Sequence, residues 1–206
     1  MAAVEHPMQA LQHYLPEGSF ERAVHYLHTH KVHLTVTRVR KSVLGDYRNA
    51  VTGKNHRISI NGNLNKYAFL ITLLHELAHL LAFEKFGNRI ASHGNEWKTI
   101  YRRLLADFIT TKIFPAEIEN ALRQSLQNPA ASSCAEDGLI RVLKLYDTPK
   151  ENFYFIEQLP AGSWFKTKEG KVYQKGVRLR KRYKCKEIKT GFVYLFSPVY
   201  EVERVE

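Results

Sequence analysis

Residues 72–79 of the chain, TLLHELAH, lie inside a run from Tyr67 to Phe83 that is otherwise apolar. Residues three and four apart share one face of a helix, so the polar side chains of this run fall on a single stripe: Thr72, His75, Glu76 and His79. A helix that is apolar nearly all round is a buried helix. The sequence therefore predicts two imidazoles and a carboxylate in a water-poor interior, where such groups need partners.

A divalent metal ion is the partner that accounts for all three groups. Histidines at i and i+4 project from successive helical turns, so His75 and His79 are placed to bind one zinc ion. Glu76 reaches the same side without being a ligand, which places it to take a proton from a water activated by the metal. The alternative is a pair of core histidines bonded to the backbone, with Glu76 paired to one of them. The His-Glu-x-x-His pattern on an apolar helix favours the metal.

A catalytic zinc usually has three protein ligands and one open position, so we expect a third ligand downstream. Glu84 lies five residues after His79 and would have to reach back along the helix axis. His93 follows a helix stop at Gly87-Asn88 and a short loop, which lets the chain reverse and bring a second helix against the first. Glu96, near the start of that second helix, is the runner-up. We therefore predict that His93 is the third ligand.

Three segments of the chain resemble one known family: RISINGNL (57–64), LLHELAHLLAF (73–83) and SHGNEW (92–97), with its His-Gly-x-x-Trp pattern. They are similar to the SprT-like metalloproteases, which include Spartan, the DNA-dependent protease that removes proteins crosslinked to DNA. The resemblance covers roughly residues 11–114. It implies that His75, His79 and His93 bind zinc and that Glu76 is the catalytic acid and base.

The chain departs from this family in its C-terminal part. Many members carry a four-cysteine zinc ribbon after the protease core, whereas this chain has two cysteines, Cys134 and Cys185, and no C-x-x-C pair. A four-cysteine ribbon is therefore impossible. Residues 182–196, RYKCKEIKTGFVYLF, resemble a remnant of such a module without its metal. Two cysteines without evident partners, and an N-terminus without the pattern of a secretory signal, predict a cytoplasmic protein.

We expect an α+β fold. A chain of 206 residues that is 44% hydrophobic buries a core large enough for one large or two small domains. A zincin-like helical core is predicted over residues 1–128, a linker over 129–137, and a small all-β barrel or meander over 138–206, whose first strand is expected at 139–146. The run from Tyr67 to Phe83 has 17 residues and contains Glu76, which favours a core helix over a membrane span.

A small antiparallel sheet is expected just before the zinc helix. Alternating apolar residues predict strands at 32–38 and 57–61, and turns are expected at 45–48 and 52–55, on either side of a short strand. By resemblance to zinc peptidases, an edge of this sheet would bind an extended substrate by strand addition.

The positive charge is concentrated near the C-terminus. Residues 166–189 hold eleven Lys or Arg against two acidic residues, in a chain with a net charge of +11. If residues 177–186 form one strand, alternate positions line one face with cations, and interleaved aromatic residues such as Trp164 and Tyr183 are suited to stack on unpaired bases. The pattern predicts binding of single-stranded DNA through Arg178, Arg180, Lys181, Arg182 and Lys184. The alternative is a solvated basic face over core aromatic residues.

The sequence thus predicts a zinc-dependent metalloprotease that hydrolyses peptide bonds in DNA-associated or DNA-crosslinked proteins. Two alternatives stay open: a general zinc peptidase without a nucleic acid partner, and a catalytically idle protein that binds nucleic acid. No membrane partner is expected, and nothing in the sequence indicates an oligomeric state. Besides zinc, Tyr101 and Arg102 are candidates for stabilising the oxyanion, with neither favoured.

Overall fold

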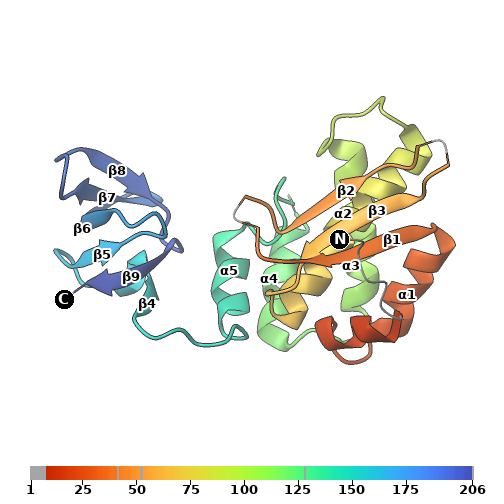
Figure 1. The fold of residues 1–206 in the computed structure, drawn as a ribbon, viewed down its shortest axis with the longest axis horizontal. Helices are drawn as coiled ribbons and strands as arrows, with labels where there is room; N and C mark the ends of the chain where they lie inside the picture. The colour runs from red at the N-terminus through yellow and green to blue at the C-terminus, as the bar shows by residue number, and fades with distance from the viewer. Residues whose placement is uncertain (1–7, 41, 52, 128, 206) are drawn as a thin grey trace, which may run out of the picture. The chain divides into compact units, whose positions relative to one another are not determined.

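The computed structural model describes residues 8–40, 42–51, 53–127 and 129–205. It divides into two compact units, Met1–Asp147 and Thr148–Glu206, each of which is described by itself. The first unit combines helices with a three-stranded sheet, and the second is built around a six-stranded sheet (Figure 1). The predicted α+β class is confirmed. The first seven residues of the predicted helical core lie outside the described residues.

The run around residues 72–79 forms helix α2 (Lys66–Phe86). The Asn65 side chain caps the first turn by accepting a hydrogen bond from the Ala68 amide at 2.9 Å. The helix ends at Gly87, whose φ of 63° lies in the region that favours glycine. Within the described residues, α2 is the one helix long and apolar enough to cross a bilayer, but 72% of its apolar window is buried inside the protein. The prediction of a buried core helix is confirmed.

Other helices complete the core of the first unit. α2 packs against the sheet and against α3 (Asn95–Ile109), whose Trp97, Leu105 and Phe108 are fully buried. The remaining segments are η1 (Met8–Tyr14), α1 (Phe20–Thr29), α4 (Ala116–Ser125) and α5 (Asp137–Lys144). Because α2 lies within this packing, its polar stripe is held in a fixed, water-poor setting.

The sheet of the first unit is mixed. Its strands β1 (Val32–Thr37), β2 (Gly45–Arg48) and β3 (His56–Asn61) follow the order β1-β3-β2, with β3 parallel to β1 and antiparallel to β2. The prediction of an antiparallel sheet is wrong at the β1–β3 pair. β3 is the central strand, with Ile58 and Ile60 fully buried, and β2 is an edge strand.

Strand β2 corrects a second expectation, since residues 45–48 form the strand itself and not a turn. Gly45 is required there by close approach to α2. A Cβ atom at this position would lie 2.7 Å from Thr72 Cγ2 and 2.7 Å from Glu76 Oε1. The glycine that signals a turn in the sequence is present because the strand passes against the helix.

Residues 139–146 correct a third expectation, since they do not form a strand. They belong to the first unit, mostly to α5, whose Leu139 and Leu143 are buried four residues apart. Leu139, Val142, Leu143 and Tyr146 follow helical spacing, so in so short a stretch the apolar pattern is ambiguous between helix and strand. The segment before α5, predicted as a linker, also belongs to the first unit.

The second unit is an antiparallel sheet in the strand order β4-β9-β5-β6-β7-β8, as the all-β prediction requires. The elements are β4 (Phe153–Phe155), η2 (Ile156–Gln158), β5 (Trp164–Lys166), β6 (Val172–Leu179), β7 (Arg182–Glu187), β8 (Val193–Phe196) and β9 (Glu201–Val205). Phe165, Tyr173 and Cys185 belong to its small core. Lys175 is also buried there, with its ammonium bonded to the Leu159 carbonyl and 4.3 Å from the Tyr183 ring centre.

The basic run over residues 177–186 is a hairpin, not one strand. It turns at Arg180-Lys181 between β6 and β7, with Arg180 at a φ of 45°. Arg178 is the cross-strand partner of Tyr183, whereas Arg182 and Lys184 lie on the opposite face of β7 from Tyr183. The predicted single row of cations is therefore wrong, because the turn divides it between two strands and two faces.

Candidate metal centre

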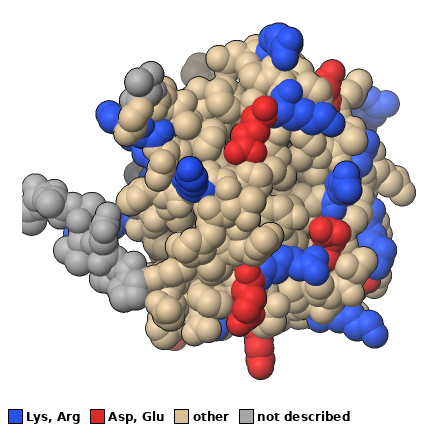
Figure 2. Space-filling model, turned by 90° about the vertical axis from the view of Figure 1, so that its right-hand side faces the viewer, with Lys and Arg blue, Asp and Glu red and all other residues tan. Residues whose placement is uncertain are grey.

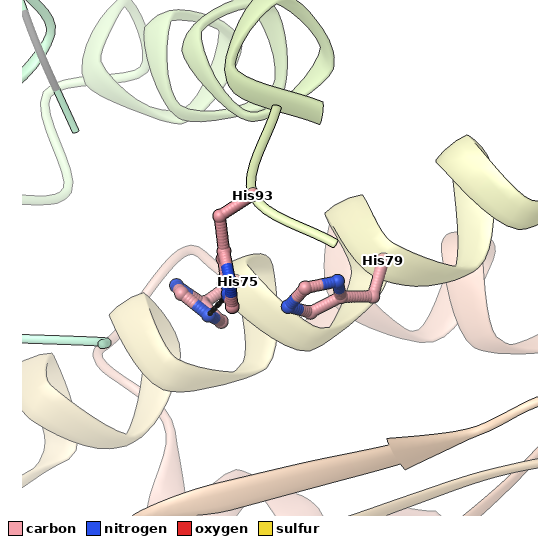
Figure 3. A group of neighbouring side chains, drawn as sticks. All are labelled: His75, His79 and His93. Carbon is pink, nitrogen blue, oxygen red and sulfur yellow. Dashed lines mark hydrogen bonds between the residues drawn. The ribbon is translucent and has the colours of Figure 1, made fainter. Parts of the chain in front are cut away.

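Three histidines converge from two elements of the first unit. His75 and His79 project from α2, and His93 comes from the turn before α3 to meet them (Figure 3). One ring nitrogen from each lies within 4.8 Å of the other two. The structure thus brings together the three residues that the sequence selected, although they are up to 18 positions apart in the chain.

The geometry of this donor set suits a tetrahedral metal ion. Two nitrogens bound to one zinc ion at about 2.05 Å each are about 3.3 Å apart. The Nε2 atoms of His75 and His93 are 3.4 Å apart, which matches that edge. The widest pair has to close by less than 1.5 Å from 4.8 Å to reach the same spacing, a shift that side-chain rotation supplies. These residues therefore fit the metal that the sequence predicts.

Burial keeps the imidazoles in the neutral form that binds metal. Burial, and secondly proximity to His79 and His93, lowers the pKa of His75 to about 3. The pKa of His79 falls to about 4 for the same reasons, burial first and His93 second. Neutral rings offer a lone pair without having to release a proton.

Trp97 forms one side of the histidine cluster. It is fully buried, and its ring centre lies 4.7 Å from those of His75 and His93 and 5.1 Å from that of His79. The Tyr101 ring stacks on Trp97 from the next turn of α3, at 5.0 Å. This aromatic wall explains the tryptophan of the His-Gly-x-x-Trp pattern, because it fixes the orientations of three rings by packing.

Glu76 is the buried carboxyl group beside the histidines. It is 6% exposed, and burial together with the nearby Asp46 raises its pKa to about 8. The main-chain amide of Tyr47 donates a hydrogen bond to it, which acts in the opposite direction. Together with the close approach of Gly45, this bond places the carboxyl group between α2 and the edge strand β2.

A cleft of about 450 Å³ opens onto these groups. It is lined by the three histidines, Glu76, residues 42–47, Ser92 and residues 131–133. Residues 131–133 were missed by sequence reasoning, which assigned them to a linker. Their small, polar composition gives the same signal in a linker and in a packed surface segment, so the sequence did not contain the distinction.

The other candidate site residues do not belong to the histidine cluster. The carboxylate of Glu84 is 2.7 Å from His30 Nδ1 and 3.8 Å from His56 Nε2, and Glu96 is exposed. Neither belongs to the group of residues that can share a metal. Tyr101 and Arg102 do not line the cleft, and the Arg102 guanidinium bonds to the carbonyls of Leu126 and Gln127.

The five residues predicted to bind nucleic acid lie in the second unit. All five are exposed, and they gather at the β6–β7 turn: Arg178, Arg180, Lys181, Arg182 and Lys184. By contrast, the face drawn in Figure 2 intersperses basic and acidic side chains among uncharged ones. The role of the five residues at the β6–β7 turn in binding nucleic acid stays a prediction.

Comparison with known proteins gives one family. The chain matches the SprT-like family over residues 8–119, which are 112 of its 206 residues. Curated relatives named Protein SprT from Pseudomonas putida F1 and Pseudomonas fluorescens Pf0-1 are each 55% identical over 31 residues. That segment is 15% of this chain, and the chain spans about a fifth, 19%, of the length of these relatives. No solved structure matches. Because the family match covers more than half of the chain and includes the whole histidine cluster, the chain belongs to the SprT-like family.

Proposed function

We propose that this protein is a zinc-dependent metallopeptidase. The observation that carries the proposal is the convergence of three neutral imidazoles beside a buried carboxyl group, at a cleft bordered by an edge strand. Membership of the SprT-like family supports it. The two free cysteines support a place in the reducing cytoplasm.

The residues divide the work of peptide hydrolysis between them. His75, His79 and His93 would hold the zinc ion, which when bound polarises a carbonyl and lowers the pKa of a nearby water. Glu76 accepts a proton from the attacking water on a carboxylate oxygen and gives it to the nitrogen of the leaving amine. Its pKa of about 8 in the metal-free protein suits it to both steps, since a cation alongside favours the carboxylate form.

Strand β2 is the surface that we propose for the substrate. It pairs with β3 along one edge only. The amide of Tyr47 is directed to Glu76, so the main-chain groups of Gly45, two residues earlier, face the same side. An extended polypeptide can add to this edge by main-chain hydrogen bonds, which select for an extended backbone more than for particular side chains.

The test uses the zinc-loaded full chain and fluorescein-labelled β-casein. We expect cleavage that stops when zinc is removed with EDTA and returns when zinc is restored. In Glu76→Gln the rate should fall by about 100-fold or more, with zinc content still at one ion per chain. Unchanged cleavage in Glu76→Gln would refute the role of this residue, and no cleavage by the zinc-loaded parent chain would refute the peptidase.

We also propose that the second unit binds single-stranded nucleic acid through the β6–β7 turn. The exposed cations of that turn support this, together with Trp164 and Phe192, which are 46% and 68% exposed in the same unit. A natural substrate would then be a DNA-associated protein. Cleavage of such a protein that rises when single-stranded DNA is added supports this substrate, whereas cleavage indifferent to DNA supports a general zinc peptidase.

Binding itself is tested with labelled oligonucleotides at several salt concentrations. We expect the triple change Arg180→Gln, Lys181→Gln and Arg182→Gln to weaken binding and to reduce the salt slope by up to about 2, at about 0.7 for each phosphate contact. Lys166→Gln, Lys168→Gln and Lys171→Gln remove the same charge from other positions in the unit and serve as the control. Equal losses in the two triple variants would contradict a site at the turn.

A further inference from the structure

Segment 129–136, which connects α4 to α5, borders the metal centre. Its residues Ala131, Ser132 and Ser133 line the same cleft as β2, Glu76 and the three histidines. Nothing in the proposed catalytic chemistry uses these three residues. Their position beside the reacting groups therefore needs another account.

The segment is held at both ends. Just before its start, Arg102 of α3 donates hydrogen bonds of 2.7 Å to the carbonyls of both Leu126 and Gln127, and Pro129, its first residue, is buried. At its end, Glu136 accepts hydrogen bonds from the Ser125 hydroxyl and from the Ala130 amide, the latter at 3.1 Å. Charge-assisted bonds of this kind are stronger than neutral ones. The segment is thus a fixed part of the first unit.

The segment lines the cleft with small side chains only. Ala131, Ser132 and Ser133 present small, uncharged side chains, and the two hydroxyl groups can donate and accept hydrogen bonds. A wall of this kind offers contacts to a polypeptide backbone. It complements β2, which offers main-chain groups along the same cleft.

We propose that segment 129–136 is a substrate-binding wall of the cleft. In this proposal, Ala131, Ser132 and Ser133 contact a polypeptide laid along β2, and Arg102 is a positioning residue that holds the wall without touching the substrate. The inference rests on the proposed peptidase function and adds its second binding surface. It predicts that substrates are selected by the width of an extended chain that fits between the strand and the segment.

A binding experiment separates this inference from catalysis. The zinc-loaded Glu76→Gln chain is titrated with fluorescein-labelled β-casein, and anisotropy reports binding. Adding Ser132→Trp should weaken binding at least tenfold, because the indole would occupy the cleft. Adding Ala135→Trp should change it less than twofold, because Ala135 is equally exposed in the same segment but lies outside the cleft lining.

Equal effects of Ser132→Trp and Ala135→Trp, or no casein binding by the Glu76→Gln chain, would overturn the proposal that segment 129–136 binds substrate. If the unchanged chain binds casein without cleaving it, the peptidase function is refuted. The substrate-binding wall is still supported in that case if Ser132→Trp weakens casein binding more than Ala135→Trp does. Zinc content and the unfolding temperature, measured on every variant, identify any loss that comes from misfolding.

The positioning role of Arg102 is tested with its exposed neighbour as the control. Arg102→Gln removes both bonds to Leu126 and Gln127, just before the segment, so KM for casein should rise at least threefold, while kcat and zinc content stay within twofold of the parent values. Arg103→Gln removes the same charge one residue away and should leave KM unchanged. A fall in kcat with unchanged KM, or equal effects of the two variants, would overturn the assignment of Arg102.

Discussion

Gly45→Ala is the most direct test of how the edge strand β2 and helix α2 fit together. The added Cβ would lie 2.7 Å from Glu76 Oε1, 2.7 Å from Thr72 Cγ2 and 2.9 Å from Glu76 Cγ. Ordinary contacts begin near 3.4 Å, so 3.4 minus 2.7, about 0.7 Å, must come from movement of β2 or of the Glu76 side chain. Either movement disturbs the hydrogen bond between the Tyr47 amide and Glu76.

The expected loss follows from that displacement. Overpacking of this kind costs about 1–3 kcal/mol of stability, and misplacing a catalytic group by about 1 Å costs about 100-fold in rate. We therefore expect kcat/KM for casein to fall by about 10- to 100-fold in Gly45→Ala, with zinc content unchanged because the three atoms nearest to the added Cβ belong to Thr72 and Glu76.

Gly138→Ala is the matched control. Its Cβ would meet nothing within 4 Å, and it lies in α5, where alanine stabilises a helix by about 0.5–1 kcal/mol relative to glycine. We expect unchanged kcat/KM and a slightly higher unfolding temperature. If Gly45→Ala kept both kcat/KM and the unfolding temperature of the parent, the close approach of β2 to Glu76 would be refuted.

Three further changes test other parts of the structure. The metal-free chain should lose stability as pH falls from about 6.5 toward 3, because the folded pKa values of His75 and His79, about 3 and about 4, lie below the unfolded value and the unfolded chain binds the extra protons. Each histidine contributes up to about 1.4 kcal/mol per pH unit, and the raised pKa of Glu76, about 8, offsets part of this loss until the unfolded carboxylate is protonated as well. Thermal melts in EDTA check this, and a flat profile would contradict it. Arg40→Ala removes the bonds from its guanidinium to Asn61, Ser59 and the Leu44 carbonyl, so it should cost about 1–3 kcal/mol in chemical denaturation, whereas the exposed Arg38→Ala should cost less than about 0.5. Lys175→Met leaves the Leu159 carbonyl without its ammonium partner and should destabilise the second unit by about 1–3 kcal/mol, while Lys186→Met, at an exposed position, should have little effect in the same denaturation assay.

Helix α2 and its histidines were predictable from the sequence because their signal is local. The i, i+4 spacing of His75 and His79 fixes their common face, and the break at Gly87 leaves a loop short enough to return His93. The central place of β3 and its parallel pairing with β1 depend on tertiary packing, which no local pattern encodes.

Gly45 and residues 129–146 show why the remainder was not predictable. A glycine beside an aspartate favours a turn locally, and only contact with α2 makes it part of a strand. The apolar spacing around Leu139 is too short to separate helix from strand. Segment 129–136 has the composition of a linker. Its place beside the cleft depends on the hydrogen bonds of Arg102 and Glu136, which the sequence does not reveal.

The intrinsic fluorescence of Trp97 is sensitive to the histidine cluster on which its ring packs. The chain has two tryptophans: Trp97 is fully buried against all three histidines, while Trp164 is 46% exposed in the other unit. A buried indole emits at shorter wavelength than a hydrated one, and its emission intensity responds to the charge of the rings packed on it. The short-wavelength side of the intrinsic fluorescence therefore reports the histidine cluster, so a titration of the unlabelled protein with zinc tests whether these histidines bind it.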